Sequence, residues 1–380
     1  MKCKCYNIST KHQLFLLTAM IAILFTLMGC EKEKNLDKKP HKPVMGDASP
    51  SPAAGPPFRH ETSVSPAKPV FNSMSGAKAG EKGTKVVKKE HPKVVYKAGE
   101  DPEFAKACGW PVKCSAPLQG SILPSKRIVA FYGNPLSKKM GVLGAYPKEE
   151  MLRRLKREVL KWEKADPDHP VQPALHLIAV VAQGVPGKAG MYRMVMPDEI
   201  TNRIYGWARE TRSIMFIDIQ TGHEDIRAVL PRFEWLLKNP DVHLGIDPEF
   251  NLVKSCKIPG TKIGTYDAAD INYASEFLNE MIKKYRLPPK ILIVHRFTQD
   301  GVTNASRIIL RPEVQMVMNM DGWGAPSLKR STYKSYIVKE PVQYTGFKLF
   351  YHNDTKMGCP LMTPKDVLKL APKPLYIQYQ

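Results

Sequence analysis

Two carboxylic acids, Asp247 and Glu249, lie two residues apart at the end of a short apolar run. Side chains alternate along a strand, so residues at this spacing share one face. A carboxyl group beside a second carboxylate can have a raised pKa and donate a proton near neutral pH. Hydrolysis of a glycosidic bond requires such an acid together with a second carboxylate. Glu249 is therefore a candidate general acid; the alternative is a carboxylate that only forms an ion pair with a neighbouring base.

Other apolar runs end in acids and amides with the same spacing. Asp218 and Gln220 are placed to share a face, and so are Asn319 and Asp321. Several carboxylates around one opening are costly unless something uses or neutralises them. We therefore take Asp218 and Asp321 as further candidate catalytic groups. The alternative for Asp218 is a structural ion pair with Arg296 or another base.

Polar and aromatic side chains near these acids are candidate substrate contacts. They are Tyr132, Asn134, Gln183, Gln220, His295 and Trp323. Trp323 stands between two glycines and could stack against a sugar ring or plug a loop. His295 could contact a substrate or only form hydrogen bonds inside the fold, and His176 is interpreted as structural. Asp267 completes the predicted ring of polar groups.

Eight short apolar runs, each with a polar end, must position these groups. Runs of this length suit parallel strands that are covered on both faces. They are residues 127–134, 175–183, 214–220, 242–249, 263–267, 291–295, 314–321 and 374–380. Because helical periodicity alternates with the runs, we predict an α/β fold with a parallel sheet. The specific prediction is a (β/α)8 TIM barrel over residues 101–380, with the acids at the mouth formed by the strand C-termini.

The segments between the runs are predicted as helices or loops. Apolar residues recur at three- and four-residue steps in five segments, which are 148–165, 198–211, 224–238, 270–285 and 363–370. The stretch 251–262 is predicted to be a loop without a helix. Residues 322–361 are predicted to be a long insertion that arches over the mouth as a lid or wall.

The first 29 residues have the pattern of an export signal. Three lysines precede a mostly apolar stretch over residues 14–27, which is short for a transmembrane span. The stretch closes on Leu-Met-Gly-Cys at 27–30, which resembles the bacterial lipoprotein lipobox. That resemblance implies cleavage before Cys30 and lipidation of its thiol; the alternative is an uncleaved N-terminal anchor. Either way we expect a membrane-anchored protein of the cell envelope, periplasmic or on the outer surface.

Residues 30–100 are predicted to be a disordered tether that starts at the lipidated cysteine. The segment is rich in Pro, Lys, Gly, Ser and Ala and cannot bury enough apolar surface to offset the entropy of ordering. The whole chain carries 57 Lys and Arg against 36 Asp and Glu, a net charge of +21. A basic surface favours anionic partners such as lipid headgroups or wall polymers. No nucleic-acid motif accompanies the charge, so no nucleic-acid partner is expected.

Four of the seven cysteines remain once the predicted signal and the lipidated residue are set aside. An even number in an exported domain predicts two disulfides. Of the three possible pairings we favour Cys108–Cys114 with Cys256–Cys359. Zinc ligation by these cysteines is not expected, because their spacings do not match zinc motifs.

The Asp-Pro-Glu unit at 247–249 resembles the Asp-x-Glu of barrel glycosidases that act on N-acetylated sugars, including chitinase-like and lysozyme-like groups. The chitinase-like resemblance implies that Glu249 protonates the leaving oxygen and that Asp247 orients the acetamido group. Val242 and Gly245 stand where the fuller chitinase-like motif has aspartates.

The chain also resembles a group of uncharacterised bacterial exported lipoproteins with a glycoside-hydrolase-like TIM barrel. The resemblance covers about residues 126–380 and rests on five segments. They are Phe-Tyr-Gly-Asn-Pro (131–135), Gly-Ile-Asp-Pro-Glu-Phe (245–250), Val-His-Arg-Phe-Thr (294–298), Asn-Met-Asp-Gly-Trp-Gly (319–324) and the terminal Tyr-Ile-Gln-Tyr-Gln. This resemblance implies the fold and not an activity.

Three functional hypotheses follow. The leading one is a membrane-anchored glycoside hydrolase, or a glycoside-hydrolase-like protein, that acts on or binds an envelope or environmental glycan without a metal or other cofactor. The second is a metal-dependent hydrolase, of the phosphoester type, that uses oxygen and imidazole ligands. Its candidate ligands are Asp218, Asp247, Glu249, Asp267, His295 and Asp321. The third is a non-catalytic glycan-binding lipoprotein.

Overall fold

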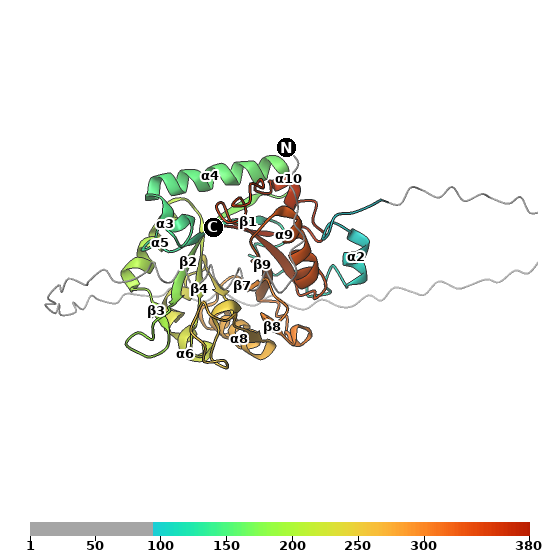
Figure 1. Cartoon of the computed structure of the whole chain (residues 1–380). Coiled ribbons are helices and arrows are strands. Elements are labelled where there is room, and N and C mark those ends of the chain that lie inside the picture. Colours follow the sequence, from blue (N-terminus) through green and yellow to red (C-terminus); the bar gives the residue numbers. More distant parts are fainter. Residues whose placement is uncertain (1–93) are drawn as a thin grey trace, which may run out of the picture. The chain divides into compact units, whose positions relative to one another are not determined.

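Eight parallel strands close into a barrel in the computed structural model, which describes residues 94–380 (Figure 1). The strands are β1 (Arg127–Gly133), β2 (Val171–Ala182), β4 (Ile214–Ile219), β5 (Val242–Ile246), β7 (Lys290–Arg296), β9 (Val314–Met320), β10 (Tyr344–Leu349) and β11 (Tyr376–Tyr379). The ring closes because β1 pairs with both β2 and β11. The predicted TIM barrel is therefore confirmed. The predicted signal peptide, Cys30 and nearly all of the tether lie outside the described residues.

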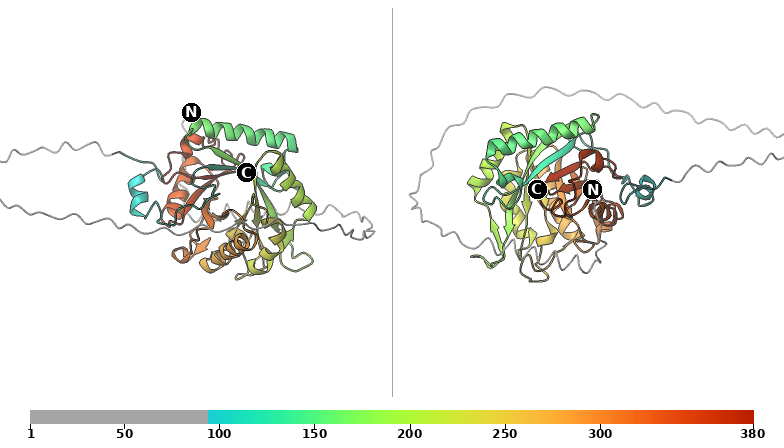
Figure 2. Two further views of the ribbon diagram at one scale, coloured as in Figure 1. Left: turned by 180° about the vertical axis from the view of Figure 1, so that it is seen from behind. Right: turned by 45° about the horizontal axis from the view of Figure 1, so that its top comes forward.

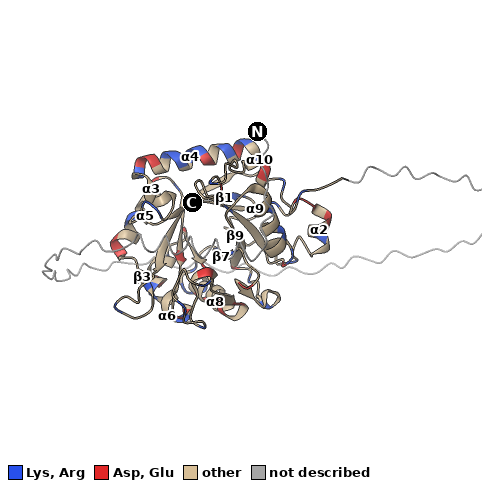
Figure 3. Cartoon of the chain, in the orientation of Figure 1, with Lys and Arg blue, Asp and Glu red and all other residues tan. Residues whose placement is uncertain are grey.

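Helices and helical turns connect the strands and surround the barrel, as the views in Figure 2 show. They are α3 (Val142–Ala145), α4 (Lys148–Ala165), α5 (Asp198–Glu210), α6 (Ile226–Val229), η1 (Leu230–Phe233), α7 (Glu234–Leu237), α8 (Ala268–Tyr285), η3 (Ala305–Arg307), α9 (Pro326–Tyr333), the π-helical turn η4 (Lys334–Val338) and α10 (Pro364–Val367). Helix α4 has the predicted bounds. Met151, Leu155, Glu158 and Trp162 are buried on its inner face, and charged residues line its outer face (Figure 3).

The fifth barrel strand was predicted at the wrong place. Residues 263–267 yield only β6 (Tyr266–Asp267), which pairs with β8 (Val302–Thr303) in a separate two-stranded sheet. The connection from β5 to β7 therefore contains helix α8, and it is an ordinary β/α unit. The prediction failed because Asp267 is the N-cap of α8, where its side chain accepts a hydrogen bond from the backbone N–H of Ala269.

Residues 322–361 are also not a lid. This segment contains α9, η4 and the barrel strand β10, which pairs with β9 and β11. Residues 344–349 form β10, whereas residues 334–338 are helical. The strand was missed because Gly346 and Lys348 interrupt its apolar pattern.

Short elements complete the chain. Strand β3 (Arg193–Val195) adds to β2 in antiparallel orientation. Helix α2 (Pro102–Ala107) lies against η4, where the Lys334 ammonium is 4.3 Å from the centre of the Phe104 ring. No helix among residues 94–380 is long and apolar enough to cross a membrane.

Neither predicted disulfide forms among the described residues. Cys108 caps α2, whereas Cys114 is exposed and its sulfur lies 3.9 Å from the Gln343 amide nitrogen. Cys256 is exposed in the loop after β5, and its sulfur is 3.4 Å from the carbonyl oxygen of Val253. The pairing was inferred from the even number of cysteines, but a disulfide also requires that the fold bring two cysteines close together, which their number does not determine.

The interior of the barrel changes from apolar to polar along the strands. Near the strand N-termini it is filled by a buried cluster that includes Ile128, Ala130, Ala174, Ile214, Phe216, Ile291, Ile293 and Val317. Positions further along the barrel strands, or directly after them, carry polar side chains. These buried polar residues are Tyr132, His176, Asp218, Asp247, His295, Asn319, Lys348 and Gln378. Strand alternation therefore gathers the chemistry of the chain inside the C-terminal half of the barrel.

Candidate functional site

His295 lies between two carboxylates inside the barrel. Its Nδ1 is 2.9 Å from Oδ2 of Asp321, and its Nε2 is 3.5 Å from Oδ1 of Asp218. The amide of Asn319 lies 3.3 Å from the same Nδ1. All of these side chains are buried. Asn319, in β9, and Asp321, directly after the end of that strand, therefore both reach His295.

Lys348 of β10 provides a second cation to this cluster. Its ammonium is 2.9 Å from Oδ1 of Asp321 and 3.9 Å from the centre of the Tyr132 ring. Tyr132 in turn donates a 2.8 Å hydrogen bond from its hydroxyl to Oδ2 of Asp218. Sequence reasoning missed Lys348 because it lies on the strand that was interpreted as an insertion.

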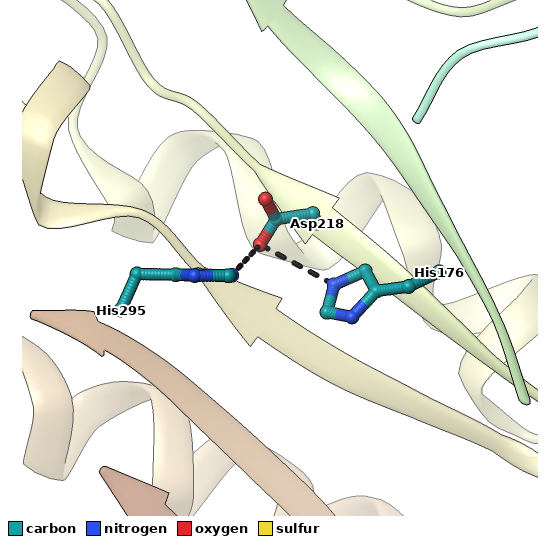
Figure 4. A group of neighbouring side chains, drawn as sticks. All are labelled: His176, Asp218 and His295. Atoms are coloured by element: carbon teal, nitrogen blue, oxygen red, sulfur yellow. Dashed lines mark ion pairs between the residues drawn. The ribbon is translucent and has the colours of Figure 1, made fainter. Parts of the chain in front are cut away.

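His176 of β2 completes the group, although it was interpreted as structural. Its Nε2 is 3.6 Å from the same Asp218 oxygen that His295 approaches, so that both imidazoles point at one carboxylate (Figure 4). Its Nδ1 is 2.6 Å from the hydroxyl oxygen of Tyr376. One potential ligand atom from each of His176, Asp218 and His295, an imidazole nitrogen or a carboxylate oxygen, lies within 4.8 Å of the other two. A signal was available in the sequence, since His176 follows Ala174 by two residues and therefore points into the barrel.

The cluster has balanced charges. Burial alone would raise the pKa of Asp218, but the two imidazoles that face it lower that pKa far below its ordinary value. Burial alone would also raise the pKa of Asp321, and Lys348 and His295 lower it. Burial opposes protonation of His295, yet the two aspartates raise its pKa to about 10. Two ionised aspartates are thus matched by two cations, Lys348 and His295.

Among residues 94–380, no cation forms an ion pair with Asp247 or Glu249. The chain leaves β5 at Ile246, so Asp247 is the N-cap of the 3₁₀ turn η2 (Pro248–Phe250) and accepts a 3.1 Å hydrogen bond from the backbone N–H of Glu249. Gln220 donates to the other Asp247 oxygen at 3.2 Å. Burial, together with the nearby ionised aspartates, raises the pKa of Asp247 to about 7. Burial and the Asp247 charge raise the pKa of Glu249 well above its ordinary value.

Glu249 differs from the other candidate acids in its access to solvent. It is partly exposed, whereas Asp218, Asp247 and Asp321 are buried. Within residues 94–380 its carboxyl group has no ion-pair or hydrogen-bond partner. The alternative of a salt-bridged Glu249 is therefore not what the described residues form. The expectation that Asp247 and Glu249 share a strand face is wrong, because the strand ends before Asp247.

Several other predicted residues lie elsewhere or have partners inside the fold. Asp267 caps α8 and accepts hydrogen bonds from Thr303 and Asn304, so it is not part of the buried cluster. Arg296 forms an ion pair with Glu340 at 2.7 Å and not with Asp218, because it is next to His295 and therefore points out of the barrel.

Some candidate substrate contacts also have partners inside the fold, and others are partly exposed. The amide of buried Asn134 donates to the carbonyl oxygen of Ile178 and the sulfur of Met196, so it anchors the fold. Gln220 bridges the backbone N–H of Ala182 and Asp247. Gln183 and Trp323 are partly exposed beyond the ends of β2 and β9. These last two remain predicted substrate contacts.

Gly245 makes room for the imidazoles and the carboxylate. It faces the cluster from β5, and a methyl group at this position would lie 2.5 Å from Oδ1 of Asp218 and 2.6 Å from Nε2 of His176. Both distances are too short for real contacts. Since the two side chains are fully buried, they have little freedom to move away.

We expect Gly245→Ala to lower the free energy of unfolding by about 1–3 kcal/mol, because the added methyl group overpacks the cluster. Chemical denaturation followed by circular dichroism measures the change. The matched control is Gly206→Ala in α5, where the added carbon meets nothing within 4 Å; alanine at this exposed helical site should stabilise the protein by roughly 0.5–1 kcal/mol. Equal stability of Gly245→Ala and the unchanged protein would contradict the close packing.

Comparison with known proteins assigns no family. The chain matches no protein-family model, and no curated protein is similar to it in sequence. Among solved structures, it is similar to XEG5A, a GH5 xyloglucan-specific endo-β-1,4-glucanase from a metagenomic library, in complex with cellotriose. The identity is 10%, the TM-score is 0.34, and the similarity covers 62% of this chain and 79% of that chain. A likeness this distant carries no argument about activity, and the barrel assignment rests on the strand pairing described above.

Proposed function

We propose that this protein is a barrel hydrolase of glycosidic bonds, with Glu249 as the general acid. The observation that supports this proposal is a carboxyl group that has no ion-pair partner among residues 94–380 and belongs to a partly exposed residue, placed beside a second acid at the C-terminal end of the barrel. A general acid must reach the substrate and must hold a proton near neutral pH. Among Asp218, Asp247, Glu249 and Asp321, only Glu249 meets both conditions.

Asp247 is proposed as the second catalytic group. Its position next to Glu249 suits either orientation of the substrate or stabilisation of the positive charge that develops on the sugar ring. Asp218 and Asp321 are proposed to hold His295 and Lys348 in place, so that the negative field of the cluster keeps a proton on the Asp247–Glu249 pair. Gln183 and Trp323, partly exposed beyond their strands, are proposed to contact the glycan.

The cellular setting is proposed from the sequence. Cleavage before Cys30 and lipidation of its thiol would anchor the barrel to a membrane through the predicted tether, which places an envelope or environmental glycan within reach. Metabolic labelling with a fatty acid tests this part: Cys30→Ser should lose the label and leave the membrane fraction. Retention of label in that variant would contradict the lipidation site.

A hydrolysis screen tests the proposed activity directly. The full-length protein is incubated with chitin oligosaccharides, peptidoglycan fragments and β-glucans, and the products are identified by mass spectrometry. We expect cleavage of at least one glycan class, with a rate that falls as the pH rises through the raised pKa of Glu249, because an ionised Glu249 cannot donate a proton. Binding without cleavage at any pH would instead support a non-catalytic glycan-binding protein.

We also expect Asp247→Asn to stabilise the fold at alkaline pH. The raised folded-state pKa means that the folded protein holds a proton which an unfolded aspartate loses near pH 4. Stability is therefore highest below about pH 4, declines as the pH rises to about 7, and stays reduced above it. The asparagine variant should be more stable than the unchanged protein by about 1–3 kcal/mol at pH 8 and similar to it near pH 4, in urea unfolding with EDTA present.

Asp267→Asn is the control for the sign of this effect. Hydrogen bonds from Ala269, Asn304 and Thr303 lower the pKa of Asp267, so its contribution to stability is present above its unfolded pKa and is lost on acidification. That variant should be less stable than the unchanged protein at pH 7, and the difference should vanish in acid. If Asp247→Asn showed the same direction, the carboxyl of Asp247 would be ionised without penalty in the fold.

A further inference from the structure

Three buried atoms inside the barrel converge on one point without hydrogen-bond partners among the described residues. They are Nε2 of His176, Oδ1 of Asp218 and Nε2 of His295. All three side chains are at most 1% exposed. Buried polar atoms are normally paired, because an unpaired one costs its desolvation energy. Figure 4 shows the contacts among them as ion pairs of 3.5 and 3.6 Å, which are long for hydrogen bonds, and a bound cation would pair all three atoms at normal distances.

The second nitrogen of each imidazole is already engaged. Nδ1 of His295 lies 2.9 Å from Oδ2 of Asp321, and Nδ1 of His176 lies 2.6 Å from the hydroxyl oxygen of Tyr376. The Gln378 amide nitrogen also lies 3.1 Å from Nδ1 of His176. In the metal-free cluster the positive charge beside Asp218 is that of protonated His295. A divalent ion would replace the proton on Nε2 of His295, while the Nδ1–H of the same ring still faces Asp321. A carboxylate behind a ligand histidine is also the usual outer shell of a protein metal site.

The separations fit a metal ion better than direct hydrogen bonds. The Nε2-to-Oδ1 distances are 3.6 Å for His176 and 3.5 Å for His295, longer than a good N–H to O hydrogen bond. A tetrahedral ion with bonds of about 2.0–2.2 Å holds its nitrogen and oxygen ligands roughly 3.3–3.5 Å apart. Gly245 leaves the space beside these atoms free of a side chain.

We propose that His176, Asp218 and His295 bind one divalent transition-metal ion inside the barrel. Two imidazoles and one carboxylate suit Zn²⁺ with a water molecule in a fourth position, and the same ligand set also suits Fe²⁺. The ligand set differs from the one predicted from the sequence, since it includes His176 and leaves out Asp267, Asp247 and Glu249. The inference does not depend on glycan hydrolysis, because the proposed acid and its neighbour are not ligands.

Metal titration of the full-length protein without a polyhistidine tag tests the site. After removal of metal with a chelator, Co²⁺ should bind with a stoichiometry of one and give the visible absorption of a four- or five-coordinate ion, and Zn²⁺ should displace it. At free Zn²⁺ near one hundred times the Kd, the melting temperature should rise by roughly 4–5 °C. A parallel titration with Fe²⁺ under nitrogen shows which ion binds more tightly.

Variants separate this site from adventitious binding. His176→Gln should weaken Co²⁺ binding by roughly 100-fold or more, and Tyr376→Phe, which alters only the outer shell, by about 10-fold. His243→Gln is the matched control: this imidazole is equally buried in the barrel, but its Nδ1 accepts a hydrogen bond from the backbone N–H of Ile291. It should retain the metal.

Two results would overturn the proposal. One is an absence of stoichiometric Co²⁺ or Zn²⁺ binding to the unchanged protein, which would leave a proton shared within an ion-pair cluster as the occupant. The other is equal binding by His176→Gln and the unchanged protein. If His176→Gln does not fold, Gly245→Ala serves in its place, because it keeps every ligand and should still lose the ion through crowding of two ligand atoms.

Discussion

Glu249→Gln is expected to reduce kcat for a native glycan by about 10²–10⁴-fold, the usual contribution of a general acid. Glutamine preserves the shape and the hydrogen-bonding reach of the side chain but has no proton to donate to the leaving oxygen. KM should change little, since the loss occurs in the transition state and not in binding. Initial rates over a range of glycan concentrations separate the two parameters.

The leaving group provides the sharpest control for this variant. An aryl glycoside with a strongly acidic leaving group needs little protonation, so Glu249→Gln should retain much more activity on it than on a native glycan. Glu280→Gln, at an exposed position of α8, should be unaffected on both substrates. Equal losses on the two substrates in Glu249→Gln would point to a structural defect, and unchanged turnover of the native glycan would remove Glu249 from the mechanism.

The choice of Glu249 follows from the charge balance of the whole cluster. Four buried or partly buried acids lie near two cations, and those cations neutralise Asp218 and Asp321. Burial and the nearby negative charges disfavour the ionised forms of the remaining pair, Asp247 and Glu249. The pKa of each carboxyl group is therefore raised, and the pair keeps a proton to higher pH. One fold thereby holds ionised and protonated carboxyls side by side, which is the condition for acid catalysis near neutral pH.

Most of the barrel could be predicted from the sequence because buried parallel strands are continuous apolar runs. Residues 127–133 and 290–296 illustrate this, since both strands coincide closely with predicted runs. β10 could not be recognised in the same way, because its inward positions carry Gly346 and Lys348. Gly346 is required there, since a methyl group would lie 2.6 Å from Oδ1 of Asn319. Gly346 and Lys348 therefore serve the site and also interrupt the apolar pattern by which this strand would be recognised.

The site was predicted only in part for a related reason. The acids could be located because they stand at strand ends, but their partners lie on strands that are distant in sequence. His176 and His295 are separated by more than one hundred residues and meet only at Asp218. Asp267 has the same residue type and a similar position after an apolar run, and it is a helix cap. Only the closed barrel shows that Asp218 belongs to the buried cluster and that Asp267 caps a helix.

Replacing Lys348 by methionine is expected to lower the free energy of unfolding by about 3–5 kcal/mol. Methionine keeps the apolar stem that packs near Tyr132 and Phe350 but removes the ammonium that lies 2.9 Å from Asp321. Asp321 is buried and is then left with His295 alone, so the variant retains a carboxylate without enough positive charge. Urea unfolding in the presence of EDTA measures the loss without interference from a bound metal.

A double variant separates the lost charge from lost packing. Lys348→Met combined with Asp321→Asn removes both members of the pair and should recover at least about half of the stability, because no uncompensated carboxylate remains. Lys148→Met tests the opposite case: its pair with Glu210 has the same chemistry but lies at the surface, where Lys148 is partly exposed and Glu210 is exposed, and its loss should cost less than about 1 kcal/mol. If Lys348→Met cost no more than Lys148→Met, the ammonium would not be what compensates Asp321. The charge balance that leaves the proton on the Asp247–Glu249 pair would then have no physical basis.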